Sequence, residues 1–172
     1  KTTVLKQSIT AIAYNSALVL SSIIVVDKVE DLQAPIPEAQ LKENPYTFGL
    51  MKLTPALVNK FTKAGEMSWI FVIYNATLDA TAGKPDLTVE YSFYQKTKEG
   101  EKYFNKTSPQ AFNAQTLPPQ WDGKLMNQIS AGQSVPLASF PEGEFRLEVK
   151  VQDKLANKTL TENVTFTVVA GS

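Results

Sequence analysis

The side chains that could carry out chemistry in this chain are carboxylates, lysines and hydroxyls, because its 172 residues include no histidine and no cysteine. This composition excludes thiol nucleophiles, disulfide bonds, the common zinc sites and the most frequent general base. Lys+Arg and Asp+Glu both number 17, so a net charge of zero offers little long-range attraction to nucleic acid or to an anionic membrane. We therefore expect no nucleic-acid partner, no cofactor and no catalytic residues.

Acidic residues occur in two places where calcium could bind. Asp27, Glu30 and Asp31 follow an apolar segment, and Asp79 and Asp86 bracket a polar loop. Carboxylate oxygens are the ligands that calcium prefers, and the loops of β-sandwiches often carry them. The alternating acids and central glycine of an EF-hand loop are absent. The spacing favours solvated carboxylates, with Asp27, Glu30 and Asp31 as the calcium alternative.

A second acidic pair, Glu142 and Glu144, raises the alternative of a hydrolase. Glycosidase chemistry needs two carboxylates that face each other across roughly 5 to 10 Å. Glu142 instead lies within a Pro-Glu-Gly turn, Pro141–Gly143, and Glu144 directly follows it, with no cleft signature around them. The pattern favours surface charge over catalysis, and we predict that the chain is not an enzyme.

Aromatic residues provide the candidate ligand-binding site. Trp121 lies in the turn-forming stretch Pro118–Gly123, where an indole could be held outward as a platform for a sugar ring or for a partner protein. Tyr103 and Tyr94, together with Phe104, could extend that platform. The alternative, which the sequence favours, is that Trp121 closes the open end of a β-sandwich.

Several segments have the pattern of β-strands. Met67–Tyr74 is almost continuously apolar and is predicted to be a central strand with both faces covered and Trp69 in the core. Tyr46–Met51 alternates over a shorter stretch, and Ser108–Gly132 is predicted to be mostly loop with short pairing segments. The clearest alternation of apolar and polar residues occurs in Leu87–Phe93, Phe145–Val151 and Val164–Val168.

These patterns predict an all-β fold, an immunoglobulin-like antiparallel β-sandwich with an N-terminal β segment. The segment Gln7–Val26 carries no charge, and Ile9–Val26 within it approaches the ~20 residues of a membrane span. Its Tyr-Asn-Ser turn and β-branched residues favour two buried strands instead. We predict an N-terminal strand pair in residues 1–34, a proline-containing crossover in residues 35–45 and the main sandwich in residues 46–170. Whether the first segment completes the sandwich stays open.

Three blocks of sequence resemble a known group of proteins. They are Ala17–Val25 with the proline-containing connection after it, Gly65–Asn75, and Phe140–Lys154. Together they resemble the C-terminal immunoglobulin-like β-domains of exported bacterial proteins of the GWxTD-domain and von Willebrand factor A-related groups. The GWxTD signature itself is absent, so only the accessory β-domain matches. The resemblance implies an extracytoplasmic domain, in the periplasm, at the cell surface or secreted, with no catalytic residues.

The leading functional hypothesis is a non-catalytic structural or protein-interaction module of a larger exported bacterial protein. Its expected partners are other domains of the same polypeptide or another protein, and a membrane is not expected among them. The alternative is a carbohydrate-binding module that uses exposed aromatic residues around Trp121, with polysaccharide as its partner.

Overall fold

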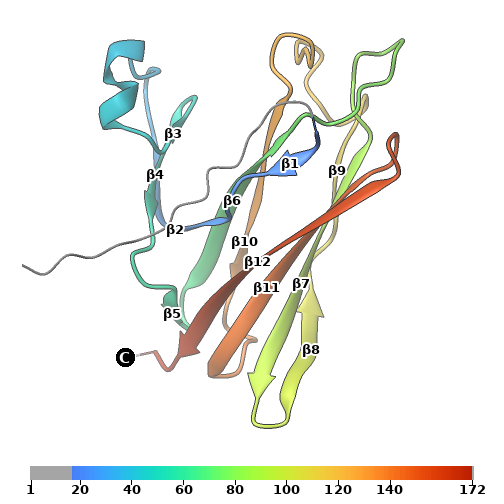
Figure 1. Cartoon of the computed structure of the whole chain (residues 1–172). Helices are drawn as coiled ribbons and strands as arrows, with labels where there is room; N and C mark the ends of the chain where they lie inside the picture. The colour runs from blue at the N-terminus through green and yellow to red at the C-terminus, as the bar shows by residue number, and fades with distance from the viewer. Residues whose placement is uncertain (1–16, 172) are drawn as a thin grey trace, which may run out of the picture.

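The computed structural model describes residues 17–171, which form two β-sheets packed face to face (Figure 1). Sheet A contains six strands in the order β1-β6-β2-β4-β3, with β10 also pairing β6. All of its strand pairs are antiparallel. Its strands are β1 (Val19–Leu20), β2 (Ile24–Asp31), β3 (Thr47–Phe48), β4 (Met51–Pro55), β6 (Glu66–Tyr74) and β10 (Gln128–Pro136).

Sheet B also contains six strands, in the order β5-β12-β11-β7-β8, with β9 also pairing β7. The short strand β5 runs parallel to β12, and the other strand pairs of this sheet are antiparallel. Its strands are β5 (Lys60–Thr62), β7 (Leu87–Thr97), β8 (Gly100–Lys106), β9 (Gln110–Phe112), β11 (Gly143–Asp153) and β12 (Lys158–Val169).

The core lies between the two sheets and is filled by the apolar residues of the alternating strands. Trp69 of β6 is 2% exposed, and its ring meets Tyr91 and Phe93 of β7 edge-on, with centroids 5.3 and 5.9 Å apart. Phe140 and Phe145 extend this aromatic cluster, with their centroids 5.2 Å apart. Such edge-to-face pairs stabilise a core by about 0.5–1.5 kcal/mol each beyond the apolar area that they bury.

Gln110 of β9 connects the two sheets along one side. The Tyr91 hydroxyl donates to its side-chain oxygen at 2.5 Å, and its amide nitrogen donates to the Gly132 carbonyl of β10 at 3.0 Å. Burial raises the pKa of Tyr91 far above its ordinary value, so the hydroxyl stays protonated as a donor. Gly132 must be a glycine, because a Cβ there would lie 2.1 Å from the Trp69 carbonyl oxygen.

Asp153 is the buried charged residue of the described chain, and it joins two loops at one end of the sandwich. One carboxylate oxygen accepts the Thr77 N–H at 2.8 Å, and the other accepts the Ala156 N–H at 3.1 Å. These bonds fix the loop that connects β6 to β7 against the turn between β11 and β12. Satisfying both oxygens offsets the cost of removing the carboxylate from water.

Three segments differ from the sequence-based expectation or lie outside the structure. The predicted strand at Tyr46–Met51 is instead a hairpin of β3 and β4, which turns at Gly49 with a φ of 62°. Within Ser108–Gly132, pairing extends further than predicted, since β10 begins at Gln128 and pairs with the whole of β6. The proline-containing crossover includes a 3-10 helix, η1 (Glu38–Glu43). The strand predicted before Tyr14 lies outside the described residues.

The predicted fold class is confirmed: the chain is an all-β, immunoglobulin-like sandwich. The alternating rows of β7, β11 and β12 face the core as predicted, with Leu147 of β11 opposite Phe93 on one side and Val164 on the other. In the N-terminal segment, β1 and β2 are hydrogen-bonded to β6. The described part of that segment therefore contributes strands to sheet A.

Candidate interaction surfaces

Trp121, the first residue of the predicted ligand-binding set, packs inward at one end of the sandwich. Its ring lies against the core, and its Nε1 donates a hydrogen bond to the Gln128 carbonyl at 3.4 Å. The Lys84 ammonium lies 5.3 Å from the ring centroid and donates to the backbone carbonyls of Pro118, Pro119 and Trp121 itself. Lys84 and the core thus cover much of the indole that a ligand platform would need to present.

Tyr94 and Tyr103, the other two predicted ligand-binding residues, contact each other on the outer face of sheet B. Their rings meet edge-on with centroids 5.9 Å apart. The guanidinium carbon of Arg146 lies 4.4 Å from the centroid of the Tyr94 ring. Tyr103, on the edge strand β8, is 57% exposed, whereas Tyr94 is half-buried.

The structure does not bring Trp121 together with the two tyrosines. Trp121 contacts Lys84, which precedes the first residue of β7, whereas Tyr94 lies near the other end of that strand. The seven residue-to-residue steps from Leu87 to Tyr94 span about 23 Å of extended strand. The turn between β7 and β8 and the loop that carries Trp121 accordingly lie at opposite ends of the sandwich (Figure 1). Phe104, the fourth aromatic residue, packs against the core.

The three calcium candidates lie within β2, not in a loop after a strand. The Glu30 carboxylate accepts a hydrogen bond from the Lys28 ammonium at 2.5 Å, and this contact lowers the pKa of Glu30. Asp27 and Asp31 are exposed, and Asp27 lies at an irregularity in the pairing of β2 with β4. Among residues 17–171, no group of three or more acidic side chains is placed to hold a metal ion.

The two acidic residues that bracket the loop after β6 both have partners within the fold. The Asp79 carboxylate accepts the backbone N–H groups of Ala82 and Thr81 at 2.7 and 2.9 Å, and these hydrogen bonds lower its pKa. Asp86 forms an ion pair with Lys154 at 3.1 Å. Each carboxylate thus has partners of its own that stabilise the loop.

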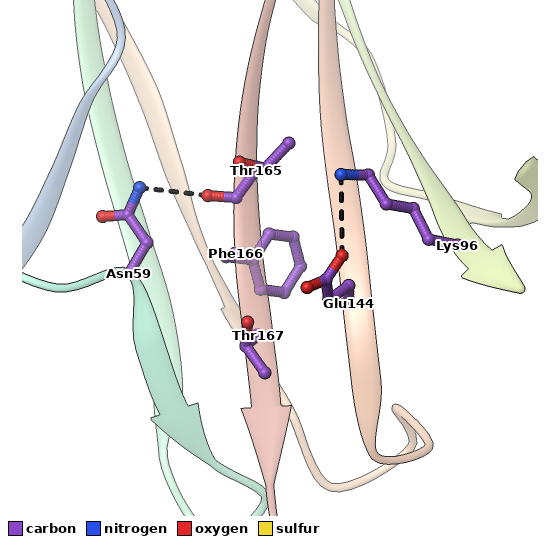
Figure 2. Close-up of a pocket in the computed structure, with 6 residues that line it drawn as sticks. All are labelled: Asn59, Lys96, Glu144, Thr165, Phe166 and Thr167. Atoms are coloured by element: carbon purple, nitrogen blue, oxygen red, sulfur yellow. Dashed lines mark hydrogen bonds and ion pairs between the residues drawn. The ribbon is translucent and has the colours of Figure 1, made fainter.

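The acidic pair Glu142 and Glu144 is divided between two environments. Glu144 lines a shallow cavity of about 270 Å³ on sheet B and forms an ion pair with Lys96 at 3.6 Å (Figure 2). At the other side of this cavity, the Asn59 amide donates to the Thr165 carbonyl at 3.0 Å (Figure 2). Glu142 is exposed and does not line the cavity. The cavity therefore lacks the second carboxylate that glycosidase chemistry needs.

A hydrophobic surface that the sequence analysis did not single out covers the outer side of sheet A. On β6, Ser68 and Ile70 alternate with the core residues Met67 and Trp69 and so point away from sheet B. Together with neighbouring strands they form a groove of about 330 Å³, and none of its lining residues is charged. We call this surface the apolar face; its side chains are Val26, Val29, Met51, Leu53, Ser68, Ile70, Ser130 and Ser134.

Exposed hydrophobic residues are concentrated in the part of the chain that contains Val29 and Met51. Seven of the eleven large hydrophobic side chains exposed in the described residues lie between positions 29 and 58. Val29 and Met51 belong to the groove, with exposures of 49% and 40%. The others are Leu41, Tyr46, Leu50, Leu57 and Val58.

One sequence signal could have located the apolar face. Met67–Tyr74 was predicted to have both faces covered because it is almost continuously apolar. Sheet B covers one face of this strand, whereas its outward residue Ile70 lines an open groove. An antiparallel strand with apolar residues on both sides needs a packing partner on each side. Within residues 17–171, the outer side of β6 is only partly covered.

No helix in the described part of the chain has the length and hydrophobicity of a membrane span. The fold and these surfaces define the chain as an immunoglobulin-like β-sandwich domain. No protein-family profile matches the chain, and no curated protein matches it. The resemblance to accessory domains of the GWxTD group therefore stays a prediction.

Solved structures provide distant likenesses. An alkylpurine DNA glycosylase from Pseudomonas fluorescens, bound to DNA with an abasic-site analogue, matches 90% of this chain over 31% of its own, with 10% identity and a TM-score of 0.49. A β-glucosidase from Listeria innocua in complex with glucose matches 67% of this chain over 15% of its own, with 9% identity and a TM-score of 0.43. An immunoglobulin-like protein from Pseudomonas aeruginosa matches 87% over 98%, with 12% identity and a TM-score of 0.36.

The chain spans less than a third of the length of the first two of these structures. With TM-scores below 0.5, these likenesses assign no activity, ligand or partner to this chain.

Proposed function

We propose that the chain is a non-catalytic interaction module of a larger exported bacterial protein, and that it docks through the apolar face of sheet A onto a neighbouring protein domain. The observation that carries this proposal is the uncharged groove over β2, β4, β6 and β10. An antiparallel sheet that faces water normally presents polar residues on its outer side. Contiguous exposed apolar surface on a folded domain is typical of a protein-interaction site.

The chemistry of the apolar face defines the surface that fits it. A charged partner residue placed over the centre of the groove, at Ile70, would lose its hydration without gaining an ion pair, since no lining residue is charged. The hydroxyls of Ser68 and Ser134 are already in contact with each other at 2.5 Å. The matching occupant is therefore a neutral, largely apolar surface of another domain.

The extracytoplasmic location is proposed together with this role. It is supported by the resemblance of Ala17–Val25, Gly65–Asn75 and Phe140–Lys154 to accessory β-domains of exported bacterial proteins. In that setting the partner is another domain of the same polypeptide or a protein assembled with it. A carbohydrate platform centred on Trp121 is not favoured, because its indole packs against the core and Lys84.

The absence of cysteine allows a direct test of the docking surface. Met51→Cys places a single thiol on the apolar face, and Leu155→Cys places one at a control position of similar exposure, 43% against 40%. Maleimide modification rates are measured in the purified domain and in the native protein within cells that produce it. We expect both thiols to react in the purified domain, and only the thiol at position 51 to be protected in the native protein.

Two outcomes would contradict the proposal. Equal reactivity of the two thiols in the native protein would show that nothing covers the apolar face. Protection at position 51 that already occurs in the purified domain would assign the cover to this chain itself. Repeating the maleimide modification at several protein concentrations would then distinguish a second copy, which gives concentration-dependent protection, from residues 1–16.

A further inference from the structure

A second groove, of about 290 Å³, lies at the edge of sheet B between β7 and β8. It is lined by the half-exposed ring of Tyr103 and by polar side chains that include Glu90, Ser92, Lys106 and Thr107. This groove is separate from the apolar face, which lies on sheet A. A ligand here would be independent of the docking surface proposed above.

A β-bulge shapes the strand at Tyr103. Tyr94 pairs with Tyr103, but the next residue of β7 towards its start, Phe93, pairs with Asn105, so Phe104 is an extra residue in β8. Phe104 packs into the core, with its ring centroid 4.8 Å from that of Phe140. Bulges increase the local twist of an edge strand and reorient the side chains beside them. The bulge thus combines a core anchor at Phe104 with an outward-facing ring at Tyr103.

The ring of Tyr103 is held in place by a chain of contacts across three strands. It meets Tyr94 edge-on at 5.9 Å, and Tyr94 in turn lies under the Arg146 guanidinium at 4.4 Å. Arg146 is fixed by ion pairs with Glu101 at 3.0 Å and Glu148 at 2.8 Å. An aromatic side chain that is positioned before a ligand arrives loses little conformational entropy when it binds.

The polar groups beside Tyr103 include both donors and acceptors. Lys106 forms no ion pair with any residue in the range 17–171, so its ammonium is available as a donor. Glu90 is half-exposed and forms an ion pair with Lys150 at 3.4 Å, which leaves acceptor capacity on its carboxylate. Because Lys150 already pairs with Glu90, Lys106 provides a free donor and Glu90 a partly free acceptor within the described residues, a combination that suits the hydroxyl groups of a sugar.

We propose that this groove binds one sugar ring of a neutral polysaccharide, with the ring packed on Tyr103. The C–H face of a neutral pyranose complements an aromatic ring, and its hydroxyl groups both donate and accept hydrogen bonds, as Lys106, Glu90 and Ser92 require. The volume lies at the lower end of ligand pockets, which are about 300–1,000 Å³. That size matches a single ring, and the position on an edge strand leaves room for the rest of the polymer.

The test is native gel electrophoresis in gels that contain laminarin, arabinoxylan, galactomannan or hydroxyethyl cellulose. Wild-type protein is expected to be retarded by at least one of these neutral polymers. Tyr103→Ala is expected to weaken that binding by about tenfold, whereas Tyr103→Phe, which keeps the ring face, should retain it. Tyr46→Ala removes another exposed tyrosine, which is 42% exposed and lies just before β3 of sheet A, and it serves as the matched control with unchanged retardation.

Amide chemical shifts of the ¹⁵N-labelled protein give a second readout. The polymer that retards the protein should shift the amide signals of Ser92, Tyr103 and Lys106 and leave those of the apolar face unchanged. The proposal is overturned if none of the four polymers retards the wild-type protein, or if Tyr103→Ala and Tyr46→Ala bind equally. Either result leaves the docking role of sheet A intact, because that role is tested by thiol protection.

Discussion

The outer faces of the two sheets differ in the kind of surface they present. On sheet B, the residues that point away from the core include Glu90, Lys150 and Arg146, and they form ion pairs with one another or with neighbouring strands. On sheet A, the corresponding positions form the apolar face, which has no charge in its groove. Both sheets supply the same kind of inward side chain, since Trp69 of one meets Tyr91 and Phe93 of the other.

The difference between the outer faces is not explained by the need to form a core. A β-sandwich needs one apolar face on each sheet, and the inner faces already satisfy that need. The ion pairs of sheet B suit a surface that stays in water. Val26 and Leu53 of the apolar face are buried within the chain itself, whereas Val29 and Met51 remain exposed and are not needed to close the core, which supports the proposed docking role.

The largest expected effect on stability comes from substituting, one at a time, two neighbouring residues of β6 whose side chains point to opposite sides of sheet A. Trp69→Ala removes a fully packed indole and is expected to lower the free energy of unfolding by about 3–5 kcal/mol. Ile70→Thr alters the outer side of the same strand and is expected to lower it by under about 1 kcal/mol. Urea unfolding followed by circular dichroism measures both. Losses of similar size would show that the outer side of sheet A is part of the folding core.

The sequence was most informative where large apolar residues recur every second position. Phe145, Leu147 and Val149 could face the core only if the chain was extended, which is why β11 was predictable. β10 was not predictable in this way, because its outward positions Ser130 and Ser134 and the central Gly132 give only a weak apolar contrast. Its pairing depends on β6, which precedes it by about sixty residues, and local patterns carry no such information.

The surfaces were harder to predict than the strands because they combine residues from distant segments. Trp121, Tyr94 and Tyr103 share an aromatic character, but the length of β7 separates the indole from the tyrosines. The apolar face requires the order β4-β2-β6-β10, and no stretch of sequence shows which strands will be neighbours. Residue types therefore predicted which side chains could bind, and the topology decided which of them meet.

A smaller effect is expected at the ionic network of sheet B. Arg146→Met keeps an unbranched side chain but removes the guanidinium, with its ion pairs to Glu101 and Glu148 and its contact with the Tyr94 ring. Arg146 is 20% exposed and its partners 37% and 27%, so solvent screens these pairs and the expected loss is only about 1 kcal/mol. Urea unfolding at low salt and in 1 M sodium chloride should show that wild-type protein loses more stability to salt than the variant.

The matched control for this experiment lies on sheet A. Lys28 and Glu30 of β2 form an ion pair at 2.5 Å, but their side chains are 64% and 42% exposed. Lys28→Met is therefore expected to leave both the stability and its salt dependence unchanged. An Arg146→Met protein with the same salt response as wild type would show that the outer face of sheet B gains nothing from its ion pairs. The charged residues on the outer face of sheet B would then contribute to solubility and not to stability.

The smallest effect concerns the loop that leads from β6 of sheet A to β7 of sheet B. Hydrogen bonds from the Ala82 and Thr81 N–H groups hold the pKa of Asp79 below its ordinary value, and the unfolded chain lacks these donors. The ionised carboxylate therefore stabilises the loop above the ordinary aspartate pKa of about 3.9, and this contribution is lost as the pH falls through the lowered folded-state value. Amide hydrogen exchange of Ala82 should accelerate relative to the intrinsic rate in that acidic range. Asp79→Asn, which keeps an acceptor oxygen but cannot titrate, should remove the pH dependence. A variant that retains it would show that Asp79 is not the source of the acid sensitivity of the loop.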